Sequence, residues 1–108
     1  MMMDLKLVSS SGKYDAFGKY DTETKKMIVC KGSLVSDVLS DSRSFRGTET
    51  IKKLRLRYTK DRKVIEDVVF SSASTAANFI TGVSTNGMVV WKNAEGEKLK
   101  TILFRMGR

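Results

Sequence analysis

Residues 41–63 hold the greatest concentration of side chains that could bind an anion. Nine lysines and arginines lie in this segment against three acids, so it carries +6 of the formal net charge of +8. Concentrated cations attract polyanions, and lysine and arginine neutralise phosphates and release their counterions. The composition therefore predicts a nucleic-acid contact, with a merely solvated basic surface as the alternative.

A helix is the element that we expect to carry these cations. Over residues 46–60, Ile51, Leu54 and Tyr58 recur at the spacing of one helical face. The candidate phosphate contacts on the opposite face are Arg46, Lys53, Arg57 and Lys60. Thr48 is the expected cap at the start of the helix. A strand over residues 54–58 is the alternative, because apolar and charged residues alternate there.

A second candidate site lies between residues 70 and 92. Ser72 is expected to cap a helix over residues 73–81, and Gly82 is expected to end it. The free N–H groups and positive dipole end at the start of this helix could bind an anion. Asn86-Gly87 predicts a tight turn, and a strand ending in Trp91-Lys92 follows it. The candidate contacts of this unit are Ser72, Ser74, Asn86, Gly87 and Lys92. Plain helix capping followed by a turn is the alternative.

The residue types give no basis for catalysis. The chain has no histidine, and its cysteine and carboxylates do not cluster at metal-ligand spacing. On a strand, Glu66 and Asp67 would point to opposite faces. The segment from Gly82 to Gly87 lacks the lysine and Ser/Thr that follow the last glycine of a phosphate-binding loop. We expect a protein without enzymatic activity, metal or cofactor.

The length and composition of the chain indicate one domain. A chain of 108 residues with 41% hydrophobic and 30% charged residues is typical of a single globular domain over residues 1–108. The one cysteine, Cys30, cannot form an intramolecular disulfide, which fits a reducing compartment. No apolar run has the length of a secretory signal or a membrane span. We expect a cytoplasmic protein with no membrane partner.

Alternating and β-branched runs predict the strands of the fold. The expected strands cover residues 5–8, 14–20, 27–33, 64–70, 88–92 and 98–104. The segments 34–45 and 93–97 are expected to be loops, the second one within a hairpin. The predicted fold class is α+β, with a mainly antiparallel sheet of about five or six strands and two helices.

Several short motifs occur in a characteristic order over about residues 14–103. They are Ala16-Phe-Gly18, Val29-Cys-Lys-Gly-Ser33, Arg46, Asp67, Phe70-Ser-Ser-Ala-Ser-Thr-Ala-Ala77, Gly82, Asn86-Gly87, Trp91-Lys92, Gly96 and Leu99. In this order the chain resembles the family called domain of unknown function 4357, which often lies at the C-terminus of GIY-YIG nuclease-like proteins. The signature is also similar to the RAMA domain, which occurs with restriction and methylation systems and is proposed to recognise modified DNA. Ala73 stands where the family usually has proline, and Thr75 replaces an alanine, yet both suit a helix.

We therefore expect a non-catalytic nucleic-acid-binding module whose partner is DNA. The resemblance implies a restriction or nuclease context and the reading of modified DNA. This expectation requires folding to bring the cations of residues 46–60 and the serine-flanked helix start into one cradle. The alternative is a protein-interaction domain, in particular a homodimer joined through an exposed terminal strand over residues 99–104.

Overall fold

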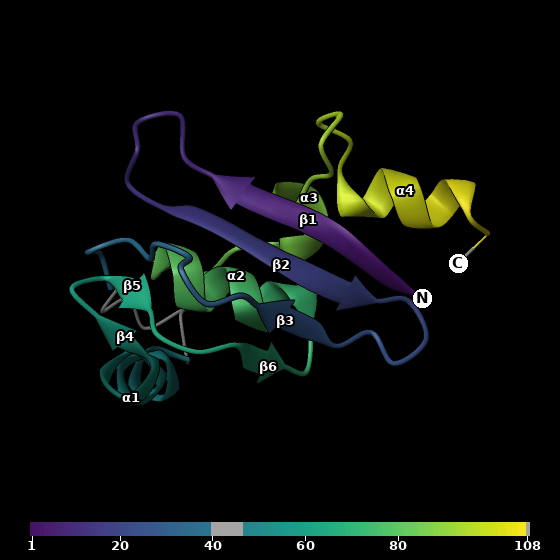
Figure 1. The fold of residues 1–108 in the computed structure, drawn as a ribbon. Helices are drawn as coiled ribbons and strands as arrows, with labels where there is room; N and C mark the ends of the chain where they lie inside the picture. The colour runs from purple at the N-terminus through teal and green to yellow at the C-terminus, as the bar shows by residue number, and fades with distance from the viewer. Residues whose placement is uncertain (40–46, 108) are drawn as a thin grey trace.

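The computed structural model describes residues 1–39 and 47–107 and is built around a four-stranded antiparallel sheet. In the order β1-β2-β3-β6, the strands are β1 (Met2–Val8), β2 (Asp15–Asp21), β3 (Met27–Val29) and β6 (Val68–Phe70) (Figure 1). Along β1, Leu5 and Leu7 are buried while Lys6 between them is exposed. This period of two places one face of the sheet in the core and leaves the other face open to solvent.

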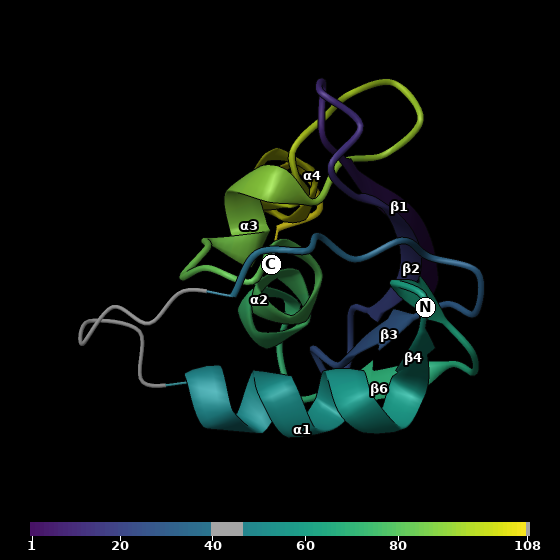
Figure 2. The same ribbon diagram turned by 90° about the vertical axis from the view of Figure 1, so that its left-hand side faces the viewer.

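Four helices and one short hairpin complete the described part of the chain. The helices are α1 (Thr48–Tyr58), α2 (Ala73–Thr81), α3 (Gly87–Val90) and α4 (Leu99–Arg105). Strands β4 (Thr59–Lys60) and β5 (Lys63–Val64) form the hairpin. Figure 1 shows α2 and α3 behind the sheet, and Figure 2 shows α1 on one side of α2 with α3 and α4 on the other. No described helix is long and apolar enough to cross a membrane.

The expected α+β class is confirmed, but the last expected strand is wrong. Residues 98–104 contain the start and most of α4 instead of a strand. Leu99, Ile102 and Leu103 are all buried, and their spacing is that of one helical face. The run therefore follows the helical period of 3.6, although its β-branched and apolar content resembles that of a strand.

The strand expected over residues 88–92 is also wrong, because this segment begins with α3. The side chain of Asn86 accepts a hydrogen bond from the backbone N–H of Met88 at 3.0 Å, as a helix cap does. Asn86-Gly87 therefore starts a short helix and does not form the tight turn that the dipeptide predicts. In consequence the main sheet has fewer strands, and the described chain more helices, than expected.

The boundaries of two other elements also differ from the expected ones. The strand predicted over residues 64–70 is divided between β5 and β6, which belong to different sheets. The helix predicted over 46–60 is confirmed as α1, so a strand over 54–58 is wrong. Gly47, not Thr48, occupies the cap position of α1. Residues 40–46, which include part of the expected loop, lie outside the described residues.

The start of α2 packs against α3 through direct backbone contact. Trp91 is completely buried, and its indole Nε1 donates a hydrogen bond to the carbonyl oxygen of Ala73 at 3.0 Å. The hydroxyl of Ser74 accepts a hydrogen bond from the N–H of Gly87 at 2.9 Å. A Cβ atom at Gly87 would lie 2.2 Å from the carbonyl carbon of Ala73. Only glycine therefore allows the two helices to approach so closely.

The other end of α2 is closed by a backbone turn that also requires glycine. Gly82 ends the helix in the left-handed region at φ 79°, as expected from the sequence. A Cβ atom on it would lie 1.7 Å from the carbonyl oxygen of Val38. The hydroxyl of Ser36 donates to the carbonyl oxygen of Thr81 at 2.6 Å. The segment around residue 36 thus satisfies a carbonyl group that a helix end leaves without a partner.

Arg55 of α1 binds the same end of α2. Its Nε donates to the carbonyl oxygen of Phe79 at 3.0 Å, and its Nη2 donates to that of Ile80 at 3.2 Å. Its Nη1 donates to the carbonyl oxygen of Val38 at 2.8 Å. The positive guanidinium group lies at the negative end of the helix dipole, which is the favourable arrangement. Arg55 therefore attaches α1 to α2.

After α3 the chain returns to the free edge of β1. Lys92 and Lys6 exchange two backbone hydrogen bonds, of 2.7 and 2.9 Å. Lys92 also pairs with Lys98 across the expected hairpin loop of residues 93–97. The sheet is thus extended locally beyond β1 by two single-residue pairings.

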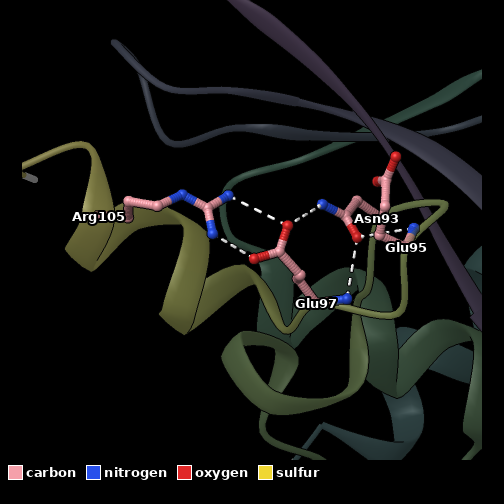
Figure 3. A network of polar contacts seen from close by, with 4 residues as sticks. All are labelled: Asn93, Glu95, Glu97 and Arg105. Carbon is pink, nitrogen blue, oxygen red and sulfur yellow. Dashed lines mark hydrogen bonds and ion pairs between the residues drawn. The ribbon is translucent and has the colours of Figure 1, made fainter.

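A polar network holds the hairpin loop and attaches it to α4 (Figure 3). The side-chain oxygen of Asn93 accepts hydrogen bonds from the backbone N–H groups of Glu95 and Glu97, at 3.1 and 2.9 Å. The carboxylate of Glu97 accepts two hydrogen bonds from the guanidinium of Arg105 and one from the amide of Asn93. These charge-assisted bonds lower the pKa of Glu97 from 4.5 to about 2.

The contact between α2 and α3 predicts that Gly87→Ala destabilises the protein. In most helices alanine is preferred to glycine, so the sign of the effect is diagnostic. We expect a loss of about 3 kcal/mol in the free energy of unfolding, because the added methyl group meets backbone atoms. Urea denaturation followed by tryptophan fluorescence measures it. Ser84→Ala, at an exposed loop position, is the control and should change stability by less than about 0.5 kcal/mol. Unchanged or increased stability of Gly87→Ala would contradict the close contact.

The lowered pKa of Glu97 predicts a pH-dependent contribution to stability. A carboxyl group whose folded pKa is below its unfolded pKa stabilises the fold above the unfolded value, and the effect is lost as the pH falls through the folded value. The urea midpoint of Glu97→Gln should therefore lie below that of the wild type at pH 7, and the difference should shrink as the pH falls from 4.5 to about 2. Glu66→Gln, at an exposed position without an ion pair in the described structure, is the control. A difference that does not depend on pH would show that the charge of Glu97 is not responsible.

Candidate nucleic-acid interface

The outward surface of α1 and the β4–β5 hairpin carries a group of exposed cations, which we call the α1 basic face. Its members are Lys52, Lys53, Arg57, Lys60 and Lys63. Each of the three ion pairs in the described structure lies elsewhere, so none of the acids in residues 1–39 and 47–107 neutralises these side chains directly. The face includes three of the four cations predicted to contact phosphate. Arg46, the fourth, lies outside the described residues.

Two other arginines of the basic segment are structural. Arg55 is half-buried at the end of α2, and its pKa is lowered by this burial and by the nearby charge of Arg62. Arg62 donates from Nε to the carbonyl oxygen of Val35 at 3.1 Å and from Nη2 to that of Lys13 at 2.7 Å. Both guanidinium groups satisfy backbone carbonyls and are less available to a ligand than the α1 basic face.

The serines of the predicted pocket take part in hydrogen bonds within the fold. Ser72 caps α2, as expected, because its hydroxyl accepts from the backbone N–H of Thr75 at 3.1 Å. It also bonds to the hydroxyl of Thr75 at 2.8 Å. The hydroxyl of Ser74 is bonded to Gly87, as described above. The structure thus gives Ser72 the capping role that the sequence offers as the alternative, whereas Ser74 joins α2 to α3.

The remaining predicted contacts are divided between two places. Asn86 is exposed and caps α3, whereas Gly87 is buried against α2. Lys92 is exposed one residue after the buried Trp91. Its backbone is paired with Lys6 of β1, so it belongs to the sheet and not to the serine-flanked helix start.

A hollow of about 440 Å³ does lie at the start of α2. Its lining comes from the end of β2, the β2–β3 connection, the start of α2, α3 and α4, namely Tyr20, Thr22, Lys25, Ser71, Ser72, Ala73, Ser74, Met88 and Leu103. Lys25 is the one cation of this lining. The wall is largely apolar, and burial raises the pKa of Tyr20 above its usual 10.0.

The predicted single cradle is not formed by the described residues. The α1 basic face lies beside the C-terminal end of α2, where Arg55 binds, whereas Ser72 and Ser74 lie at its N-terminal end. A helix of nine residues separates the two ends by about 12 Å. Figure 2 shows α1 and the hairpin that follows α3 on opposite sides of the fold.

The structure brings together a second group of cations, of which the sequence had indicated only Lys92. Lys6, Lys92 and Lys98 are exposed and lie opposite one another on adjacent strand segments, and we call them the lysine row. Phe17, directly opposite Lys6 on β2, is 46% exposed on the same face. The alternation around Lys6 was a signal that its side chain faces solvent. The pairing of Lys6 with Lys92, 86 positions apart, had no local signal.

No described group of three or more histidines, cysteines and acids could hold a metal ion. Cys30 is half-buried. Its desolvation, followed by the charge of Asp67, raises the pKa of its thiol. The site chemistry of the described residues is therefore that of exposed ammonium and guanidinium groups.

Comparison with known proteins agrees with the resemblance of the motifs. No curated protein and no solved structure matches the chain. The family model described as "Domain of unknown function (DUF4357)" matches residues 7–103. These residues include β2, β3 and β6 of the main sheet, the end of β1, and the close contact between α2 and α3. The chain therefore belongs to the DUF4357 family.

Proposed function

We propose that the protein is a non-catalytic nucleic-acid-binding module that works in the cytoplasm and contacts DNA through the α1 basic face. The observation that supports this most directly is the exposure of five cations on α1 and on the hairpin that directly follows it, with no ion-pair partner among the described acids. Ammonium and guanidinium groups in this arrangement can neutralise phosphates of a nucleic-acid backbone.

The way in which α1 is held favours a phosphate-binding role. Ile51 is buried, and Arg55 is bonded to α2, so the helix has a defined position on the fold. Lys53 and Arg57 are one helical turn apart on the outward side, which places their Cβ atoms about 6 Å apart. The guanidinium of Arg57 lies 5.3 Å from the ring centroid of Tyr58, a contact that restrains its direction.

The module is proposed to act together with domains or proteins that have restriction or nuclease activity. It rests on the similarity of the motifs to those of domains found with GIY-YIG nuclease-like proteins and with restriction and methylation systems. Under this proposal the module supplies binding, and any chemistry on DNA belongs to its partners. In its more specific form, the proposal is that the module recognises a modified base in DNA.

Homodimerisation remains the alternative, but the exposed terminal strand on which it was based is not formed. The expected terminal strand is helix α4, so it offers no strand edge to a second copy. The features that still support self-association are Leu56 on α1 and Phe104 on α4, which are 81% and 85% exposed. They lie on separate helices. Light scattering distinguishes a stable dimer that is indifferent to DNA and salt from a monomer that binds DNA.

The proposal predicts salt-dependent binding to duplex DNA. Three phosphate contacts from Lys53, Arg57 and Lys60 give a log–log slope of about −2.7, and a contact from Arg46 would bring it near −3.6. Lys53→Gln/Arg57→Gln should weaken binding and reduce the slope by about 1.8. Fluorescence anisotropy with unmodified and methylated duplexes at several salt concentrations measures both quantities.

Lys26→Gln/Lys100→Gln is the charge-matched control for this experiment. Both lysines are exposed and lie outside the α1 basic face. We expect this variant to retain the slope of the wild type. Absence of duplex binding at low salt, or an equal loss in both double variants, would contradict binding through the α1 basic face.

A further inference from the structure

The lysine row and Phe17 form one line across the open face of the sheet. Each residue is paired with the next one across the strands, in the order Lys98, Lys92, Lys6 and Phe17. Residues directly opposite in antiparallel pairs project to the same face, so these side chains lie side by side. Three strand spacings give the line a length of about 14 Å. Lys6, Lys92 and Phe17 also line one shared hollow of about 200 Å³.

Like charges placed opposite one another on a sheet are unfavourable for folding. The same strand pair shows the favourable arrangement two residues away, where Asp4 lies opposite Lys19 and the two groups are 3.4 Å apart. The lysine row does not use such a pairing. A group of like charges that lowers stability, beside a pair of opposite charges that does not, is typical of a functional site. At the lysine row, a bound ligand would supply the negative charge that the fold does not provide.

The acids that border the row do not neutralise it. Asp4 is paired with Lys19, and Glu97 is held by Arg105. Glu95, in the hairpin loop, lines a hollow of about 440 Å³ together with Lys6 and Lys92. Asp15, two residues before Phe17 on the same face of β2, is a second exposed acid without an ion pair in the described structure. With three lysines and these two acids, the surface keeps a net charge of +1. It is therefore complementary to a chain of phosphates.

The exposed ring at the end of the row adds a different kind of contact. An aromatic face can stack on a nucleobase, and adjacent cations can follow the backbone that carries it. Stacking of this kind requires a base whose face is uncovered. In a duplex each face is covered by the next base pair, whereas in a single strand it can turn toward the protein.

We propose that the lysine row and Phe17 form a binding surface for single-stranded nucleic acid, distinct from the α1 basic face. The inference rests on the proposed nucleic-acid function. It adds single-stranded nucleic acid to the duplex DNA that the α1 basic face is proposed to contact. The phosphates lie along Lys98, Lys92 and Lys6, and a base stacks on the ring of Phe17. Helix α1 and the hairpin loop of residues 93–97 lie on opposite sides of α2 (Figure 2). One group of cations can therefore be altered without the other.

Anisotropy titration with a fluorescent oligodeoxythymidine tests this surface. Three neutralised phosphates predict a log–log salt slope of about −2.1, and Lys6→Gln/Lys98→Gln should reduce it by about 1.4. Phe17→Leu should weaken binding by about fivefold or more without changing the slope, because leucine has no aromatic face. Phe17→Tyr, which keeps such a face, should restore most of the affinity.

Lys53→Gln/Arg57→Gln removes the same charge from the α1 basic face and is the matched control. It should weaken duplex binding and leave oligodeoxythymidine binding within about twofold of the wild type. Duplex binding without single-strand binding would overturn the inference and leave the proposed function standing. Absence of binding to both would overturn the two together. Equal losses from the two double variants on the single strand would also overturn the inference.

Lys92→Glu separates loss of binding from loss of folding. It places an acid between Lys6 and Lys98, so the repulsion becomes attraction and the melting temperature should rise by about 1–5 °C. The same substitution should lower affinity for the single strand by about tenfold or more, because the phosphates then meet a negative charge. Unchanged single-strand affinity of this variant would overturn the inference.

Discussion

The carbonyl group of Ala73 is the point on which the arrangement of the C-terminal third depends. It accepts the hydrogen bond of the buried Trp91 indole, and the adjoining backbone is in contact with Gly87. The bond gives the indole N–H a partner inside the core, where an unpaired donor is unfavourable. The glycine allows α3 to lie directly on the start of α2. Together they determine where the chain leaves α3 and therefore how Lys92 reaches β1.

Helix α2 links this contact to the basic surface on the other side of the fold. Its N-terminal end is held by Ser72 and by α3, and its C-terminal end is held by Gly82 and Arg55. The arginine that attaches α1 thereby leaves the neighbouring cations of α1 directed to solvent. The family motif around α2 therefore has a structural explanation, and the exposed cations lie outside its tightly packed part.

The sequence predicted the elements whose signals are local. The cap at Ser72, the stop at Gly82 and the extent of α2 needed only neighbouring residues, and they are confirmed. The segment 98–104 was misassigned because β-branched residues favour strands, whereas burial of Leu99 and Ile102 on one side decides for a helix. Tertiary contact also determined the conformation of Asn86-Gly87. A turn and a helix start use the same dipeptide, and only the packing on Ala73 distinguishes them.

The pairing of Lys6 with Lys92 joins segments that are distant along the chain. During synthesis the first hairpin, β1 with β2, can form as soon as it emerges, but the outer side of β1 stays uncovered until residue 92 is available. Uncovered strands recruit other chains, and contacts between remote residues form slowly because a long loop must first be closed. The nascent protein therefore passes through a period in which β1 is open to aggregation, and the exposed charge of Lys6 in the middle of that strand is suited to limit it.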